Sequence, residues 1–228
     1  SLNMAFNKTD DRRNVEENYK RVASALNLDI ESMVFSNQVH QNRIRVVTEE
    51  DRGKGIIRES DIIGYDGLVT NSKEVTLVTF YADCVPVFLF DPEKTVISIA
   101  HSGWRGTAMG ISKEAVGKMK EVFSCEPRNI VAAVGPSIGK CCFEVGDEVY
   151  DEFKSKIEWS TEYCDRKDKK WHFDLKAIIK KTLLDEGVRE ENIVFSEICT
   201  KCNKDIFFSH RGDNGKTGTM AGIMKVNG

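Results

Sequence analysis

Residues that bind metals or attack substrates stand where two apolar runs break or end. Cys84 interrupts the first run and His101 closes the second, and a polar turn, residues 91–94, separates the two runs. β-Branched and aromatic residues dominate both runs, so we predict a hairpin over residues 76–101 that brings the two side chains together. His40 follows another apolar run and is the candidate third member of the group.

Zinc is the metal that suits this set of residues. It accepts thiolate and imidazole ligands in tetrahedral geometry, and three protein ligands leave a fourth position free, as in catalytic zinc sites. We therefore predict a zinc site at His40, Cys84 and His101. Two alternatives stay open. Cys84 activated by His101 would be the nucleophile of a metal-free hydrolase or amidase, and the chain could instead be a metal-binding partner protein without catalysis.

Copper chemistry can be weighed by counting histidines. A blue-copper centre needs two histidines and a cysteine, and a copper cluster that reduces oxygen needs many further imidazoles. The chain has four histidines in all, too few for a multicopper centre. Copper is therefore disfavoured, and a copper-linked polyphenol oxidoreductase is the weaker hypothesis.

Polar residues beside the predicted metal ligands are candidates for further roles. Asp83 precedes Cys84 and would transfer a proton or orient a metal ligand. Asn37 and Gln38 lie in a polar run just before His40, at the end of a predicted strand, and would contact the substrate. These three assignments rest on position in the sequence.

Two short segments are candidates for binding an anion. Residues 102–106, Ser-Gly-Trp-Arg-Gly, follow a predicted strand and open a predicted helix, where backbone N–H groups favour phosphate. Arg105 would add a guanidinium group. Residues 208–211, near a late turn, would bring Arg211 or an acid–base group to the same site. The alternative is that the glycines of the first segment serve only a tight turn.

The seven cysteines are an odd number in a chain with ample core, which indicates reduced thiols in the cytoplasm rather than a disulfide framework. Cys199 and Cys202 form a CxxC pair, which is half of a structural zinc site, and Cys141 and Cys142 would supply the rest. A redox role for the CxxC pair is a second alternative. Because adjacent cysteines rarely chelate one ion and no second CxxC exists, we expect ordinary thiols.

The composition is that of a globular protein with nearly balanced charge. Apolar residues make up 40% of the chain and charged residues 30%, and the net charge is −3. Nucleic-acid and anionic-membrane binders normally carry a basic excess, so neither partner is expected. No apolar stretch approaches the ~20 residues that span a bilayer, and no secretory leader is recognised. Assembly into a homo-oligomer stays open.

Hydrophobic periodicity predicts four helices and about ten strands. The helices are expected at 10–28, 106–123, 146–157 and 174–187. The strands are expected at 32–39, 43–48, 68–70, 76–90, 95–101, 130–134, 141–145, 192–198, 205–210 and 219–226. Because helices and strands do not alternate strictly, we predict one α/β domain over residues 1–228, with a mixed sheet or two stacked sheets.

Four groups of motifs occur in an order that resembles the YlmD/YfiH-type family, also catalogued as multicopper polyphenol oxidases or laccases. They are Ala82–Pro86, His101–Gly106, Gly135–Gly139 with Cys142–Val145, and Phe208–Arg211 with Thr217–Gly218. The resemblance covers essentially the whole chain. It implies a single α/β domain of stacked mixed sheets flanked by helices, similar to the catalytic domain of deamidating cytotoxic necrotizing factor toxins.

The resemblance also implies an activity and a cofactor. Proteins of this family are described as purine nucleoside phosphorylases that act on adenosine, inosine, guanosine and methylthioadenosine, and that also deaminate adenosine. The resemblance implies a zinc ion held by His40, Cys84 and His101. Family members carry a segment upstream of the position of Ser1, so part of the substrate site is expected to lie outside this chain. Thr219 stands where arginine is common, which weakens the expectation of a phosphate contact there.

Overall fold

A computed structural model describes residues 2–6 and 10–226. Within these residues it contains five α-helices and twelve strands. The helices are α1 (Arg12–Leu26), α2 (Trp104–Ala108), α3 (Ile111–Phe123), α4 (Asp147–Lys156) and α5 (Leu175–Asp185). The strands are β1 (Met33–Phe35), β2 (Ile44–Val46), β3 (Gly67–Thr70), β4 (Thr76–Tyr81), β5 (Val85–Asp91), β6 (Val96–Ser102), β7 (Val131–Val134), β8 (Glu144–Val145), β9 (Cys164–Lys167), β10 (Lys170–Phe173), β11 (Ile193–Phe195) and β12 (Met220–Met224).

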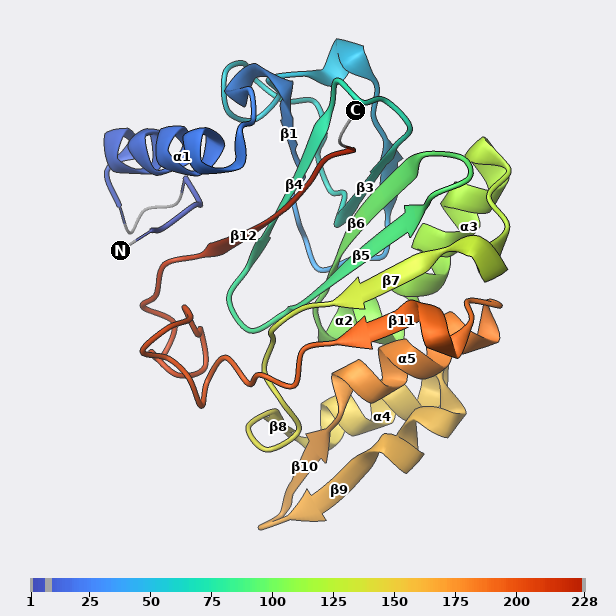
Figure 1. Ribbon diagram of the computed structural model, residues 1–228. Helices are drawn as coiled ribbons and strands as arrows, with labels where there is room; N and C mark the ends of the chain where they lie inside the picture. The colour runs from blue at the N-terminus through green and yellow to red at the C-terminus, as the bar shows by residue number, and fades with distance from the viewer. Residues whose placement is uncertain (1, 7–9, 227–228) are drawn as a thin grey trace.

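The sheets and helices are arranged in layers (Figure 1). A six-stranded sheet of order β11-β7-β5-β6-β3-β2 is stacked on a three-stranded sheet of order β1-β4-β12. Leu68 and Ile99 of the larger sheet share a buried apolar cluster with Val34 and Leu77 of the smaller one. Both sheets contain parallel and antiparallel pairs. The prediction of stacked mixed sheets is therefore confirmed.

Helices cover the outer faces of the two stacked sheets. Val15 and Tyr19 of α1 pack with Met33 and Val78 of the smaller sheet. The helices α2, α3 and α5 contribute to the cluster on the other side of the larger sheet. A third sheet, of order β8-β10-β9, lies beside α4 at the lower end of the molecule in Figure 1. Among the described residues, no helix is both long enough and apolar enough to cross a membrane.

Helix α1 shows why the periodic pattern predicted this element correctly. Val15, Tyr19 and Ala23 are spaced by four residues and are all buried, so they form one apolar stripe. The Asp11 carboxylate caps the first turn by accepting a hydrogen bond from the Arg13 N–H, and Asn27 ends the helix in the left-handed conformation. The observed bounds lie within the predicted range of 10–28.

The central hairpin is present, but the first apolar run is not one strand. β5 and β6 pair antiparallel with Pro86 opposite His101, so the predicted pairing around the candidate ligands is confirmed. The expected strand 76–90 is wrong, because β4 and β5 belong to different sheets. The chain changes sheet at residues 82–84, where Asp83 takes a positive φ of 85°. Cys84 therefore stands at this crossing, immediately before β5.

Two further predictions are corrected. The expected helix 106–123 is divided into α2 and α3 at Gly110, whose φ of 74° is left-handed and interrupts the helix. The expected strand 205–210 is absent; turns occupy this part of the described chain. The N–H groups of Ile206 and Phe207 both donate to the Asn203 carbonyl, so local turns satisfy them without a neighbouring strand.

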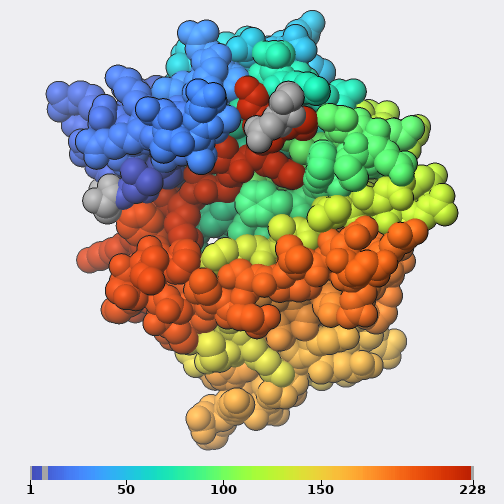
Figure 2. Space-filling model, viewed as in Figure 1, coloured from blue at the N-terminus to red at the C-terminus, as the bar shows by residue number. Residues whose placement is uncertain are grey.

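The C-terminal part of the chain crosses the surface in view in Figure 2. Its orange and red atoms fill the area between the blue N-terminal region and the yellow and light-orange segments below. Between β11 and β12 the chain runs from residue 196 to residue 219 without a helix or a named strand. Such long irregular segments are uncommon unless they serve a function.

Candidate functional site

The three predicted metal ligands come together where the β5–β6 hairpin meets the loop after β1. One ligand atom each from His40, Cys84 and His101 lies within 4.8 Å of the others. The two imidazole rings stand 4.9 Å apart between centroids and are nearly perpendicular, at 81°. His101 is almost fully buried, Cys84 is half-buried and His40 is exposed. The group thus reaches from the core to the surface, as a ligand-accepting site requires.

Asp66 organises two of these ligands and was missed by the sequence analysis. Its fully buried carboxylate accepts hydrogen bonds from the backbone N–H groups of Val39, His40 and Gln41, at 2.9–3.0 Å. It also lies 2.9 Å from Nδ1 of His101, which directs Nε2 towards the group. Burial raises the pKa of Asp66, but the hydrogen bonds from His101, Gln41 and Val39 outweigh it and lower the pKa.

The sequence signal for Asp66 was weak, because an Asp-Gly pair is typical of a turn. Only the position directly before β3, whose residues are all buried, distinguishes it. Asp66 also holds the backbone of His40, which takes a positive φ of 61°. Carboxylates that orient histidine ligands in this way are common in metal sites, where they fix the ring and raise its basicity.

Gly103 is a second residue that the site requires. A Cβ at this position would lie 3.0 Å from Cδ2 of His40 and 3.1 Å from Sγ of Cys84, and 3.6 Å from Cε1 of His101. The contacts with His40 and Cys84 are tighter than side chains normally make, so a larger residue would displace these two candidate ligands. The close approach, not an unusual φ, makes glycine necessary here.

Charge and hydrogen bonding within the group favour a thiolate. Burial raises the pKa of the Cys84 thiol, but the charge and hydrogen bond of His101 and a hydrogen bond from His40 outweigh it and lower the pKa to about 6. Burial lowers the pKa of the His101 imidazole, but the charge of Cys84 and the hydrogen bond with Asp66 outweigh it and raise the pKa to about 9. The thiolate is the form that binds a metal and the form that attacks an electrophile.

Two hollows of different character meet at the candidate ligands. The smaller has a volume of about 490 Å³ and is bordered by Arg105 and Arg211 as well as by apolar residues. The larger has a volume of about 800 Å³ and is bordered by the aromatic residues Phe35, Phe80 and Tyr81 and by Asn37 and Gln38. His40, Ala82, Cys84 and His210 border both hollows. A ligand in either hollow can therefore reach the group.

The predicted anion contacts, Arg105 and Arg211, lie on the same side of the site. Arg105 is exposed and lies over the Trp104 ring, with 4.2 Å between its guanidinium carbon and the ring centroid. Arg211 donates to the Glu144 carbonyl at 2.8 Å. Within residues 2–6 and 10–226, neither guanidinium forms an ion pair with a carboxylate, so both retain capacity for an anion. Since α2 has only five residues, these side chains rather than a helix dipole carry the anion hypothesis.

The other predicted polar residues differ in how freely they can contact a ligand. The Gln38 amide is engaged in two hydrogen bonds with the backbone of Phe80, at 2.7 and 2.8 Å. The Asp83 carboxylate is buried and accepts from the hydroxyls of Thr200 and Ser209 and from the Arg211 N–H, at 2.6–2.7 Å. These contacts give Gln38 and Asp83 positioning roles in the fold.

Asn37 is less committed to the fold than Gln38. Its residue is exposed, and its side-chain oxygen makes one long contact, 3.5 Å, with the Gly64 N–H. Its backbone carbonyl accepts from the N–H groups of Gly64 and Tyr65, which fixes the loop in front of His40. Asn37 borders the larger hollow, and most of the hydrogen-bonding capacity of its amide group is unused by the described residues.

Comparison with known proteins places this chain in a family. A family model described as multi-copper polyphenol oxidoreductase laccase matches residues 1–227. Purine nucleoside phosphorylase YlmD of Bacillus subtilis (strain 168) is 38% identical over 228 residues, covering 98% of this chain and 81% of that protein. Adenosine deaminase RL5, from an unknown prokaryotic organism, is 36% identical over 220 residues, covering 95% of this chain and 84% of that protein.

Solved structures agree with the sequence relatives. The crystal structure of the Bacillus licheniformis hypothetical protein YfiH matches with a TM-score of 0.94 at 35% identity, covering 100% of this chain and 86% of that one. YlmD from Geobacillus stearothermophilus matches with a TM-score of 0.92 at 36% identity, covering 99% and 84%. The predicted resemblance is confirmed, and the chain belongs to the YlmD/YfiH-type family, the family of the multi-copper polyphenol oxidoreductase laccase model.

Proposed function

We propose that this chain is a zinc-dependent purine nucleoside phosphorylase that also deaminates adenosine. Adenosine, inosine, guanosine and methylthioadenosine are the proposed substrates, with phosphate as the second substrate. The names of the relatives support both activities. The observation that carries the proposal is the three-ligand group with a cationic hollow on one side and an aromatic, amide-bearing hollow on the other.

The residues present fit a zinc ion. His40, Cys84 and His101 would hold it, since two imidazoles and a thiolate are donors that zinc accepts, and Asp66 supplies the carboxylate that orients His101. When bound, zinc supplies a Lewis acid that makes water a stronger nucleophile near neutral pH. Four histidines in the chain do not suffice for the several copper ions that the family model's description names.

The two hollows suggest where each part of the substrate binds. Purine rings stack on aromatic side chains, so the base would lie in the larger hollow near Phe80 and Tyr81. The Asn37 amide would meet the polar edge of the purine, because an amide offers both donors and an acceptor. Phosphate would lie in the smaller hollow, where Arg105 and Arg211 would hold it beside the ribose carbon that it attacks.

Chromatography of adenosine reactions, with and without phosphate, tests the proposal. Phosphate-dependent release of adenine and ribose 1-phosphate, and phosphate-independent formation of inosine, are expected. Protein stripped with a chelator should lose both reactions and regain them with zinc. Adenosine that stays intact in both reactions, although the protein binds one zinc ion that the His101→Ala variant does not bind, would contradict the proposal. Turnover equal to that of a His101→Ala variant would instead favour a metal-binding partner protein.

Metal-free thiol catalysis is the second candidate, and the pair formed by Cys84 and His101 favours it. Their shifted pKa values, about 6 and about 9, are those of a thiolate–imidazolium pair at neutral pH. In this hypothesis Cys84 would attack an ester or amide. Full hydrolase or amidase activity after removal of the metal, with a covalent adduct on Cys84 detected by mass spectrometry, would identify this mechanism.

A further inference from the structure

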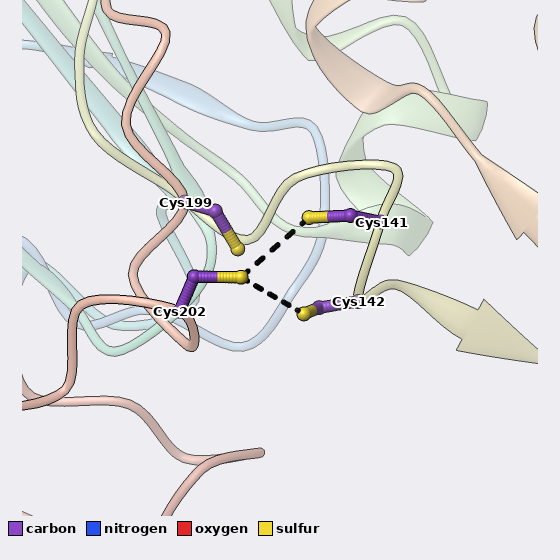
Figure 3. A group of neighbouring side chains, drawn as sticks. All are labelled: Cys141, Cys142, Cys199 and Cys202. Carbon is purple, nitrogen blue, oxygen red and sulfur yellow. Dashed lines mark hydrogen bonds between the residues drawn. The ribbon is translucent and has the colours of Figure 1, made fainter.

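A second group of potential metal ligands lies outside the site described above. The sulfur atoms of Cys141, Cys142, Cys199 and Cys202 all lie within 4.8 Å of one another. Sγ of Cys202 stands 3.8 Å from that of Cys141 and 3.4 Å from that of Cys142 (Figure 3). The first two cysteines belong to one turn and the last two to another, more than fifty residues later. The four thiols therefore converge on one place, which the expectation of ordinary thiols did not include.

The backbone shows how adjacent cysteines can face one point. Side chains of neighbouring residues point to opposite faces in a strand, but a turn does not impose this alternation. The N–H groups of Cys142 and Phe143 both donate to the Gly139 carbonyl at 2.9 Å, which closes such a turn. In the second segment the Asn203 N–H donates to the Cys199 carbonyl at 3.2 Å. This turn brings Cys202 back beside Cys199.

We propose that these four cysteines bind one zinc ion that holds the two segments together. Zinc–thiolate bonds are about 2.3 Å long, so a tetrahedral site has sulfur–sulfur distances of about 3.8 Å. The Cys202–Cys141 distance of 3.8 Å equals this value, and the Cys202–Cys142 distance of 3.4 Å is somewhat shorter. An iron–sulfur cluster spreads its thiolates over several iron atoms, which requires more widely separated sulfurs than one ion does. Binding releases the thiol protons to solvent.

The surroundings of the sulfurs suit a thiolate-rich ion. The Gly139 N–H donates to Sγ of Cys199 at 3.2 Å, a contact that stabilises a negatively charged sulfur. Four thiolates around a zinc ion carry two net negative charges, so a nearby cation is favourable. Lys176 borders the same hollow as Cys141 and Cys199, and its ammonium group donates to the carbonyls of Ser196 and Ile198.

The segment that the ion would hold lacks regular structure but reaches the candidate active site. It runs from residue 196 to residue 219 and contains the CxxC pair near its beginning. The Thr200 and Ser209 hydroxyls donate to the carboxylate of Asp83, whose neighbour in the chain is the metal ligand Cys84. The same segment places Arg211 in the smaller hollow. Zinc at the four cysteines would thus order the segment that completes the substrate site.

Metal analysis of variants tests the assignment. Wild-type protein purified under reducing conditions should bind two zinc ions per chain, and His101→Ala should bind one. The double variant Cys199→Ser, Cys202→Ser should bind one and should lose protection from tryptic cleavage within residues 196–219. Cys164→Ser is the matched control, because its thiol donates to the Thr161 carbonyl and belongs to neither ligand group, and this variant should bind two ions. This test does not depend on the proposed phosphorolysis.

A spectroscopic measurement covers the case in which the double variant does not fold. His101→Ala reconstituted with cobalt(II) should show intense thiolate-to-cobalt absorption, since only the four-cysteine site can then supply several thiolates. Folded His101→Ala without this absorption would overturn the proposal. Wild-type protein that binds a single zinc ion and whose four cysteines can all be alkylated would also overturn the proposal. Disulfides among these four cysteines, after purification under anaerobic and reducing conditions, would overturn it as well. Stoichiometric iron in place of zinc would also overturn the assignment.

Discussion

The two groups of potential metal ligands differ in the number of ligands and in what they face. His40, Cys84 and His101 offer three ligands beside two hollows, and a buried carboxylate, Asp66, holds the His101 ring and the His40 backbone. The cluster of Cys141, Cys142, Cys199 and Cys202 offers four thiols from two turns, and two of its members are exposed. Three ligands leave a position for a substrate or water, whereas four thiolates saturate a zinc ion. Ligand number thus separates the proposed catalytic site from the proposed structural one.

Replacing His101 by alanine should have the largest effect and should separate the two groups. The three-ligand group would lose its metal, whereas the cysteine cluster would keep its own. Because metal-ion catalysis supplies several kcal/mol, phosphorolysis and deamination should each fall about a thousandfold or more. Metal content and adenosine turnover are measured on the same preparation. Loss of both metal ions would show that the two groups are not independent.

Asp66→Asn should weaken the three-ligand group without removing a ligand. An amide can accept fewer of the hydrogen bonds that now come from His101 and from three backbone N–H groups. Loss of such partners weakens metal affinity about 10- to 100-fold. Competition with a chelator measures the affinity. The control is Asp61→Asn, which changes an exposed carboxylate on the same stretch of chain and should leave the metal affinity unchanged. Equal affinities in the two variants would refute the role of Asp66.

Thr200→Val tests the connection between the two groups. Valine retains the shape of threonine but cannot donate to Asp83, so a buried carboxylate loses one hydrogen bond. The free energy of unfolding should fall by about 1.5–3 kcal/mol, and hydrogen exchange in residues 196–219 should increase, with no loss of bound metal. Urea denaturation gives the first quantity. Thr161→Val, which removes a surface contact with the Glu158 carbonyl, is the control and should change stability little. Unaltered exchange would argue against the connection.

Arg105→Lys should have the smallest effect and should divide the two proposed reactions. Lysine keeps the positive charge but loses the planar fork that binds phosphate oxygens in pairs. The KM for phosphate should rise about tenfold, which corresponds to about 1.4 kcal/mol, whereas deamination without phosphate should not change. Initial rates at varied phosphate concentration measure the effect, with Arg128→Lys as a control in a distant turn. An equal loss in both reactions would place Arg105 elsewhere in the mechanism.

Local patterns allowed much of the fold to be predicted. The stripe of Val15, Tyr19 and Ala23 and the cap at Asp174 define helices through short-range contacts, and both helices were found close to their predicted bounds. The segments 76–90 and 205–210 were predicted wrongly for a different reason. Apolar character alone does not show where a strand changes sheet or whether a neighbouring strand is available, because both depend on residues far away in the chain.

The sequence by itself determined which side chains can bind a metal, because ligand chemistry belongs to the residue type. The apolar runs beside Cys84 and His101 also determined that a hairpin would bring them near one another. Only the tertiary structure decided that Asp66 orients His101 and that four cysteines from two distant turns converge. Turns are closed by backbone hydrogen bonds that hydrophobic periodicity does not reveal, and contacts between distant segments form only when the sheets and helices have packed.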